Sequence, residues 1–233
     1  MTDQDELDKI ILQLLGKDEY IGSKSSIIIY DNDDIVKLDL SDLGLTELPD
    51  GLFDNFIQLR ELDLSYNSFT HFPENMFKEL INLKRLNLSF MLDPTAFDEE
   101  DTVTLSDTLL SSQSQLEVLD LSGNQLEILP DTFFSKLYQL EVLDLSYNLL
   151  AVLPSSIGTL VNLEQLYLES NFLPIEFQTE YTTYQELQEF LTPFQQEYMA
   201  THETILSQDI DDPKAGVEDE LKKAFSALEN LFD

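Results

Sequence analysis

Few residues in this 233-residue chain could carry out chemistry. The chain has no cysteine, which excludes disulfides, thiolate metal sites and cysteine nucleophiles. Its two histidines, His71 and His202, are expected at a turn and on the polar side of a helix. The acidic run 31–34 could begin a calcium loop, but Val36 stands where that loop needs glycine. With no phosphate loop, zinc-protease motif or nucleophile elbow, we expect no enzyme, metal or cofactor.

The charge of the chain is strongly acidic, with 46 Asp and Glu against 12 Lys and Arg, or −34. Such a chain offers no basic footprint to nucleic acid and is disfavoured at anionic membranes. No apolar run approaches the roughly 20 residues that span a bilayer, and the start lacks the basic region of a signal peptide. Together with the absence of cysteine, these features favour a cytoplasmic protein.

The acidity has one local extreme, since no lysine or arginine occurs between Lys136 and Lys214. Three interpretations stay open for this stretch. It is either a solvated surface that keeps the protein soluble or a docking face for a basic partner. A salt-adapted surface is a third, weaker interpretation.

The elements that would position any site come from an internal repeat. Six segments share a Leu-x-Leu core, and their first leucines are spaced by 24, 24, 33, 24 and 23 residues. This alternation has the period of a β-strand, with side chains such as Leu62 and Leu64 pointing inward and Asp63 and Ser65 outward. One unit cannot bury its leucines alone, so neighbouring units must stack. The anchor leucines are Leu38, Leu62, Leu86, Leu119, Leu143 and Leu166.

A second pattern, Leu-Pro followed by Phe or Ile, lies between the anchors, as in 48–53 and 129–134. Both patterns closely resemble the leucine-rich-repeat family over residues 35–174. The resemblance implies an α/β solenoid with a curved parallel β-sheet on its concave face and helical caps. The bulkier convex side should carry Phe53, Phe77, Leu110, Phe134 and Ile157. Turn asparagines should bond the backbone of adjacent units, with breaks at Leu43 and Met91: Asn67, Asn124, Asn148 and Asn171.

The chain divides into five expected parts. Residues 1–34 form an N-terminal helix and hairpin cap, and residues 35–174 form about six repeats with an insertion near 92–101. Residues 175–206 form a C-terminal helical cap of two helices that Pro193 interrupts. A linker at 207–216 leads to an amphipathic helix at 217–233, which either packs on the cap or binds a partner.

Aligning the repeats brings surface residues into columns across the concave face. Apolar and aromatic side chains beside one sign of charge are typical of an interaction site. The acidic insertion adds Phe97, either as a clamp over the face or as a tolerated surface loop. The candidate partner-binding residues are Asp63, Tyr66, Arg85, Phe90, Phe97, Val118, Asp120, Val142, Asp144, Tyr147, Tyr167 and Glu169.

The sequence therefore predicts a monomeric, non-enzymatic scaffold that binds a protein partner on its concave face. Resemblance to intracellular family members implies a signalling partner such as a small GTPase, kinase or phosphatase. The alternative is an acidic binder or chaperone of a strongly basic protein. An enzyme is the rival from another class, and no motif supports it.

Overall fold

The computed structural model describes residues 28–31, 34–48, 51–71, 76–93, 104–174, 177 and 184–206. The expected N-terminal helix, the linker at 207–216, the helix at 217–233 and the insertion residue Phe97 lie outside the described residues.

Seven short strands form one sheet in the order in which they occur along the chain. Strands β2 to β7 pair in parallel, each with the next, whereas β1 pairs antiparallel with β2. The anchor leucines of adjacent repeats lie opposite one another, as Leu62 does with Leu38 and Leu86. The strands are β1 (Ile28–Asp31), β2 (Asp34–Asp39), β3 (Glu61–Asp63), β4 (Arg85–Asn87), β5 (Val118–Asp120), β6 (Val142–Asp144) and β7 (Gln165–Tyr167).

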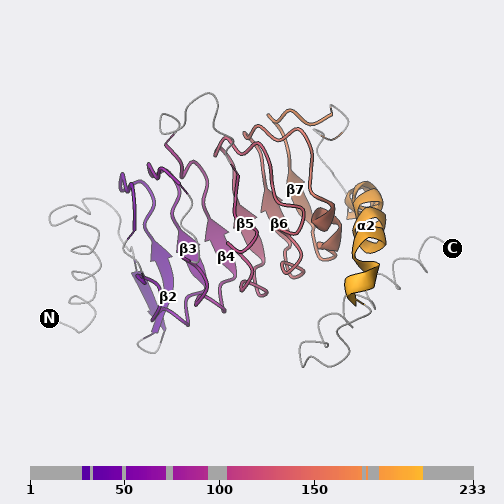
Figure 1. Cartoon of the computed structure of the whole chain (residues 1–233). Helices are drawn as coiled ribbons and strands as arrows, with labels where there is room; N and C mark the ends of the chain where they lie inside the picture. The colour runs from indigo at the N-terminus through magenta and orange to yellow at the C-terminus, as the bar shows by residue number, and fades with distance from the viewer. Residues whose placement is uncertain are drawn as a thin grey trace, which may run out of the picture.

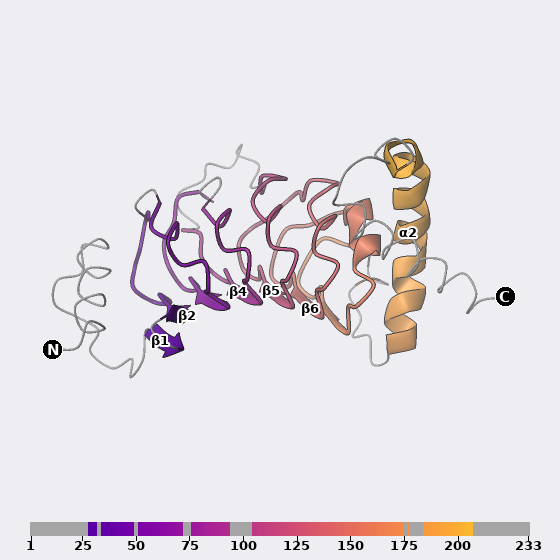
Figure 2. The ribbon, with the colours of Figure 1, turned by 90° about the horizontal axis from the view of Figure 1, so that it is seen from below.

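The repeats stack into a solenoid whose strands line its concave face, as predicted (Figures 1 and 2). All six anchor leucines are buried between the strands and the convex side. There, aromatic rings of successive repeats meet, and those of Phe53 and Phe77 stack with centroids 6.4 Å apart. The core is thus continuous from one repeat to the next, because each unit covers the apolar face of its neighbour.

Buried asparagines join the turns that follow the strands. The Asn67 Nδ2 donates to the carbonyls of Leu40 and Leu64 at 3.0 and 2.8 Å, and its Oδ1 accepts the amide N–H groups of Leu43 and Leu45 at 3.2 and 3.0 Å. One side chain thereby satisfies backbone groups of two repeats, which are costly to bury unpaired. The same arrangement recurs at Asn124, Asn148 and Asn171.

The third repeat has Met91 where the adjacent repeats have asparagine. Its backbone carbonyl accepts the hydrogen bond that an asparagine Oδ1 would otherwise accept. The Met91 carbonyl accepts the Phe69 N–H at 2.9 Å, and Phe69 forms an isolated parallel bridge with Leu92. On the other side of the insertion, Thr104 bridges Ile128 in the same way. The break in the asparagine ladder therefore leaves the stack intact.

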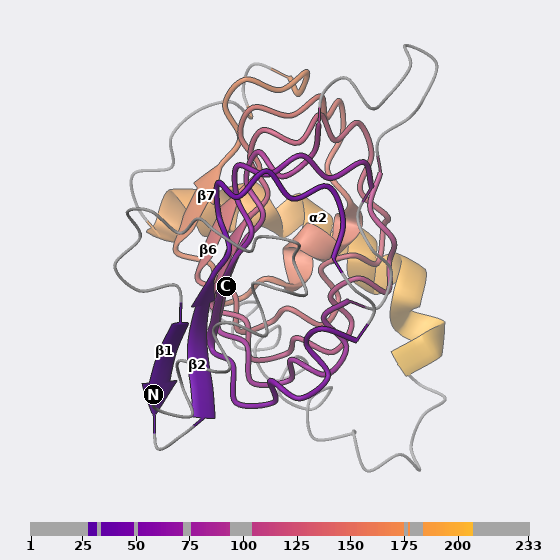
Figure 3. The ribbon, with the colours of Figure 1, turned by 90° about the vertical axis from the view of Figure 1, so that its left-hand side faces the viewer.

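The helix α2 (Tyr184–Leu206) covers the C-terminal end of the solenoid, against the 3₁₀ helix η1 (Ser155–Thr159) and β7 (Figures 1 and 3). Its buried Leu187 and Leu191 join the core. The approach is so close that a Cβ on Gly158 would lie 2.3 Å from the backbone nitrogen of Gln195. Glycine is therefore required at position 158 for α2 to pack this closely against η1.

The prediction that Pro193 divides this cap into two helices is wrong, because α2 runs through the proline as one helix. Proline removes one helical N–H bond, to the carbonyl of residue i−4, which is Glu189. Both Glu189 and Pro193 are exposed, so water can bond that carbonyl. Leu187 and Leu191 hold the preceding turns against the solenoid.

Candidate partner-binding face

Three columns of side chains cross the concave face, each with one residue per repeat. The first column holds Lys37, Glu61, Arg85, Val118, Val142 and Gln165, in strand register. The second column holds Asp39, Asp63, Asn87, Asp120, Asp144 and Tyr167. The third column, at the turn after each strand, holds Asp42, Tyr66, Phe90, Gly123, Tyr147 and Ser170.

The fold explains why the second column holds aspartate or asparagine on β2–β6. The Asp63 Oδ1 accepts the backbone N–H of Ser65 at 2.9 Å and the Ser65 hydroxyl at 2.6 Å. Asn87 holds Ser89 in the same way, so an amide serves as well as a carboxylate. The prediction that these serines point outward is wrong, since Ser65 is only 3% exposed. The serine is buried because its hydroxyl has this partner.

The fold determines the backbone conformation of the third column but not the identity of its side chains. Every member has a positive φ, from 48° at Phe90 to 69° at Gly123, a conformation that costs most residues about 1 kcal/mol or more. Backbone bonds across repeats hold it, such as the one from Tyr66 N–H to the Ser89 carbonyl at 3.0 Å. Because aspartate, glycine and serine also occupy this column, its aromatic members are not required by the turn.

Those aromatic side chains are exposed and partly stacked. Tyr66 and Tyr147 are 60% and 58% exposed. The rings of Tyr66 and Phe90 lie parallel within 9°, with centroids 5.1 Å apart. Phe90 in turn lies over Gly123, where a Cβ would be 2.4 Å from the ring. The result is an aromatic shelf that consists of Tyr66 and Phe90 and ends at Gly123.

The first column divides the face into two halves. In the charged half, β2–β4, the Lys37 Nζ donates to the Glu61 carboxylate at 2.8 Å, and this hydrogen bond raises the pKa of Lys37 above its ordinary value of 10.5. In the apolar half, β5–β7, Val118 and Val142 are half-buried register partners. No lysine or arginine stands in that half of the first column.

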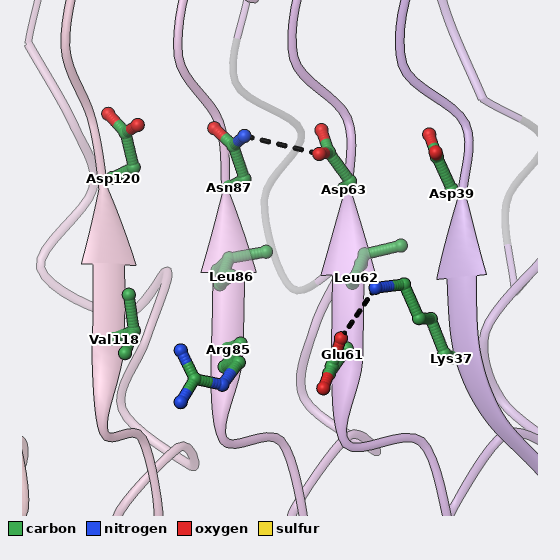
Figure 4. Close-up of a pocket in the computed structure, with 10 residues that line it drawn as sticks. All are labelled: Lys37, Asp39, Glu61, Leu62, Asp63, Arg85, Leu86, Asn87, Val118 and Asp120. Carbon is green, nitrogen blue, oxygen red and sulfur yellow. Dashed lines mark hydrogen bonds and ion pairs between the residues drawn. The ribbon is translucent and has the colours of Figure 1, made fainter.

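A shallow hollow of about 260 Å³ lies over β2–β5, mostly in the charged half (Figure 4). Lys37, Glu61, Arg85 and Val118 form its lower row in the picture, and the first four members of the second column form its upper row. The Asn87 Nδ2 donates to the Asp63 Oδ2 at 3.2 Å. The hollow is lined by Lys37, Asp39, Glu61, Leu62, Asp63, Arg85, Leu86, Asn87, Val118 and Asp120.

Asp120 closes the hollow at the boundary between the halves. Burial raises the pKa of its carboxyl above the ordinary 3.8, against the lowering effect of the Ser122 N–H at 2.9 Å. The nearby charges of Asp144 and Asp63 raise the pKa further. A cation placed here would relieve both costs of the charged form.

The predicted site residues fall into three groups. Asp63, Arg85, Val118 and Asp120 lie together in the hollow. Tyr66 and Phe90 form the aromatic shelf. The residues toward the C-terminal end, namely Val142, Asp144, Tyr147, Tyr167 and Glu169, lie on β6, β7 and the turns that follow. That any of them binds a partner stays a prediction, and Phe97 lies outside the described residues.

Sequence reasoning did not name the hollow's other polar members as site residues, namely Lys37, Asp39, Glu61 and Asn87. The signal that could have found them was the opposite charge of Lys37 and Glu61 in one column. Within the described ranges, no group of His, Cys, Asp and Glu could hold a metal ion. No described helix has the length and apolar character needed to cross a bilayer.

Comparisons with known proteins agree with this architecture. Two solved structures resemble the chain: the Arabidopsis receptor kinase HAESA in complex with the peptide hormone IDA and the co-receptor SERK1, and the leucine-rich repeat domain of APL1B. For HAESA the sequence identity is 25% and the TM-score 0.52, and the match covers 65% of this chain and 24% of that one. For APL1B the values are 20%, 0.50, 58% and 38%, a likeness of fold alone.

The chain thus spans well under half the length of these two proteins. No curated protein matches it significantly. The profile of the family described as "Leucine rich repeat" matches residues 34–90 and 104–173, more than half of the chain, and its gap falls at the long third repeat. The chain belongs to the leucine-rich-repeat family.

Proposed function

We propose that this protein is a non-enzymatic module that binds a protein partner on its concave face. Leucine-rich-repeat proteins generally mediate protein–protein interaction, and solenoid curvature provides an extended concave surface for it. The single observation that carries the proposal is the third column. Tyr66, Phe90 and Tyr147 are exposed aromatic residues at places where the turn also accepts aspartate, glycine or serine. Exposed aromatic side chains of this kind are typical of binding hot spots.

The similar HAESA structure includes a peptide hormone and a co-receptor, which supports binding of protein or peptide but does not identify a partner for this chain. We propose a monomer that meets its partner in a reducing compartment such as the cytoplasm, since the chain has no cysteine. Small GTPases, kinases and phosphatases are the partner classes to test first.

Affinity capture tests the proposal, with the intact chain and a variant carrying Val118→Ala, Val142→Ala and Tyr147→Ala as baits. We expect recovery of specific partners to fall by at least about tenfold, the effect of losing 1.4 kcal/mol of binding energy. A control variant carries Ile57→Ala and Ile81→Ala, two exposed isoleucines outside the three columns. Equal capture by all three baits would show that the apolar half is not the binding face.

A second candidate function is charge-driven capture of a strongly basic protein, favoured by the net charge of −34. Salt distinguishes the two. Screening shortens the reach of exposed charges to about 8 Å at physiological ionic strength, so purely charge-driven binding should collapse there. Binding through apolar and aromatic contacts should persist.

A further inference from the structure

We propose that the part of the hollow over β3–β5 binds an extended segment of the partner in which a basic, an acidic and a second basic side chain follow one another. This inference rests on the proposed function and specifies the partner's chemistry. The acidic side chain would pair with Arg85, and the basic side chains would face Asp63 and Asp120.

The central observation is the position of Arg85. Its side chain is exposed at the hollow, and it makes no hydrogen bond or ion pair with any residue that the structure describes. Two acidic side chains of the adjacent repeats are engaged elsewhere, because Glu61, the register partner of Arg85 on β3, pairs with Lys37 and Glu117 pairs with Lys84. An unpaired guanidinium is conspicuous in a chain with 46 acidic residues.

The neighbour of Arg85 in the next repeat is apolar. Val118 is its register partner on β5, and the guanidinium extends toward that valine (Figure 4). One side of the Arg85 head group is therefore lined by methyl groups rather than by a counter-charge. A carboxylate that entered the hollow would meet a fork of N–H donors beside an apolar side chain, and a charge-assisted bidentate bond to arginine is strong.

The opposite row of the hollow offers carboxylates. Asp63 and Asp120 flank Asn87 on the two adjacent strands. Each carboxylate uses Oδ1 to hold the serine two residues later, at 2.9 Å from the serine N–H. The Oδ2 of Asp63 has only the Asn87 amide at 3.2 Å, and that of Asp120 has no hydrogen bond among the described residues. Both can still accept bonds from a lysine or arginine of the partner.

The spacing of the rows allows an extended chain to cross the strands. The two rows lie two residues apart along each strand, about 6.7 Å, and neighbouring strands lie about 4.8 Å apart. Successive side chains of an extended segment project to opposite sides every 3.3 Å or so. Asp63 and Asp120 lie two strands apart, about 9.6 Å, whereas the two neighbours of a central residue lie about 6.6 Å apart along an extended segment. A segment running along the solenoid axis can still direct one side chain to Arg85 and its two neighbours to the aspartates, because long lysine or arginine side chains span the remaining distance of about 3 Å.

This proposal and a general attraction of basic proteins predict different central side chains in the bound segment. A purely acidic surface prefers three consecutive basic residues. The hollow disfavours a third basic side chain, because that side chain would face the Arg85 guanidinium. A preference for the mixed-charge segment is therefore diagnostic.

The test uses the full chain, labelled with ¹⁵N, and three blocked peptides that differ only in the centre: Lys-Glu-Lys, Lys-Ala-Lys and Lys-Lys-Lys between flanking alanines. Binding is followed by NMR, including the Arg85 Nε–H signal, up to about 5 mM peptide at physiological salt. We expect Lys-Glu-Lys to bind about tenfold more tightly than Lys-Ala-Lys, with Lys-Lys-Lys weakest.

Variants give the second readout. Arg85→Gln should remove the preference for glutamate, and Arg85→Glu should reverse it in favour of Lys-Lys-Lys. Lys78→Gln removes the same charge at a turn outside the hollow and should leave the preference unchanged. Amide spectra of the variants establish that each remains folded.

Three results would each overturn the inference: equal binding of Lys-Glu-Lys and Lys-Ala-Lys by the intact chain, equal or tighter binding of Lys-Lys-Lys, or no binding of Lys-Glu-Lys over the whole range. None of these results decides the proposed function, which is read from partner capture by the variant with alanine at Val118, Val142 and Tyr147. If capture depends on those residues while the peptides show no preference, only the inference about the hollow fails.

Discussion

Strands β2–β4 form the charged half of the concave face, and strands β5–β7 form its apolar half. Both halves are built from the same repeat pattern. Both halves keep the strand register and the bond from the second column to the following serine. Yet the first column changes from the Lys37–Glu61 pair and an unpaired Arg85 to Val118 and Val142. The fold therefore accounts for the aspartates and the asparagine of the second column on β2–β6 and for the turn backbone, and leaves the first and third columns free to differ.

The buried asparagine ladder that supports the turns also differs between the two halves. Under the apolar half, the Asn124 N–H donates to the Asn148 Oδ1 at 3.1 Å, so consecutive asparagines bond each other. Under the charged half, Met91 interrupts the ladder. We expect the more regular support to make the apolar half the more sensitive of the two to loss of an asparagine.

The largest effect is expected for Asn148→Ala, which should lower the free energy of unfolding by about 3 kcal/mol. It leaves the buried N–H groups of Asn124 and Leu126 without an acceptor. Asn67→Ala should cost about 2 kcal/mol, since it exposes the N–H of half-buried Leu43 to water. Urea unfolding measures both. A greater cost at Asn67 would contradict the proposed difference in support.

Gly123→Ala acts at the boundary between the halves. We expect a loss of about 1 kcal/mol from the positive φ, and displacement of the Phe90 ring from the aromatic shelf. Gly44→Ala is the matched control, because its φ is 58° but no atom lies within 4 Å of its added Cβ. Aromatic NMR shifts should change only for Gly123→Ala. Unchanged Phe90 signals in that variant would contradict the close contact between the ring and Gly123.

Glu61→Gln breaks the ion pair of the charged half. The two side chains are 41% and 39% exposed, so the cost at pH 7 should be about 0.5 kcal/mol. Because the folded-state pKa of Lys37 is raised, the pair stabilises the protein below pH 10.5 and loses its contribution as the pH rises through the folded value. The difference between variant and parent should therefore vanish in alkaline solution. If the stability difference persisted in alkaline solution, it would come from side-chain packing and not from the ion pair.

Asp120→Asn is expected to have the smallest effect, a gain of about 0.5 kcal/mol or less at pH 7. The amide can hold Ser122 as Asn87 holds Ser89. The pKa of Asp120 is raised in the folded state, so its charge costs stability at neutral pH, and this cost disappears as the pH falls toward 3.8. Thermal unfolding from pH 4 to 7 tests this.

The control for that variant is Asp107→Asn, at an exposed turn. It reports the general benefit of removing one negative charge from a chain of net charge −34. If both variants gain equally at every pH, the gain at Asp120 reflects net charge rather than its burial.

The repeat made the fold predictable, because the spacing of Leu38, Leu62 and Leu86 specifies both strands and register. The burial of Ser65 was not predictable from alternation alone, since a strand of three residues ends before the serine and its hydroxyl turns to Asp63. Continuity through Pro193 depended on tertiary packing of the helix. Local propensity contains no information about such contacts.

The candidate site was only partly predictable. Aligning the repeats predicted which residues lie on the concave face. Arg85 and Asp120, which line the hollow, were among the candidates. The hollow itself depends on which charged side chains pair and which stay free. Whether Glu61 reaches back to Lys37 or forward to Arg85 is decided by side-chain geometry that the one-dimensional pattern does not contain.

The bridges beside the third repeat have an evolutionary consequence. Phe69 and Leu92 pair just before the long segment, and Thr104 and Ile128 pair after it. The ends of that segment are thus held by backbone bonds that depend on no particular side chain. Insertions and deletions can therefore accumulate between Leu92 and Thr104 in homologous genes without shifting the register of any strand. In an alignment of such genes, we expect length variation to concentrate there.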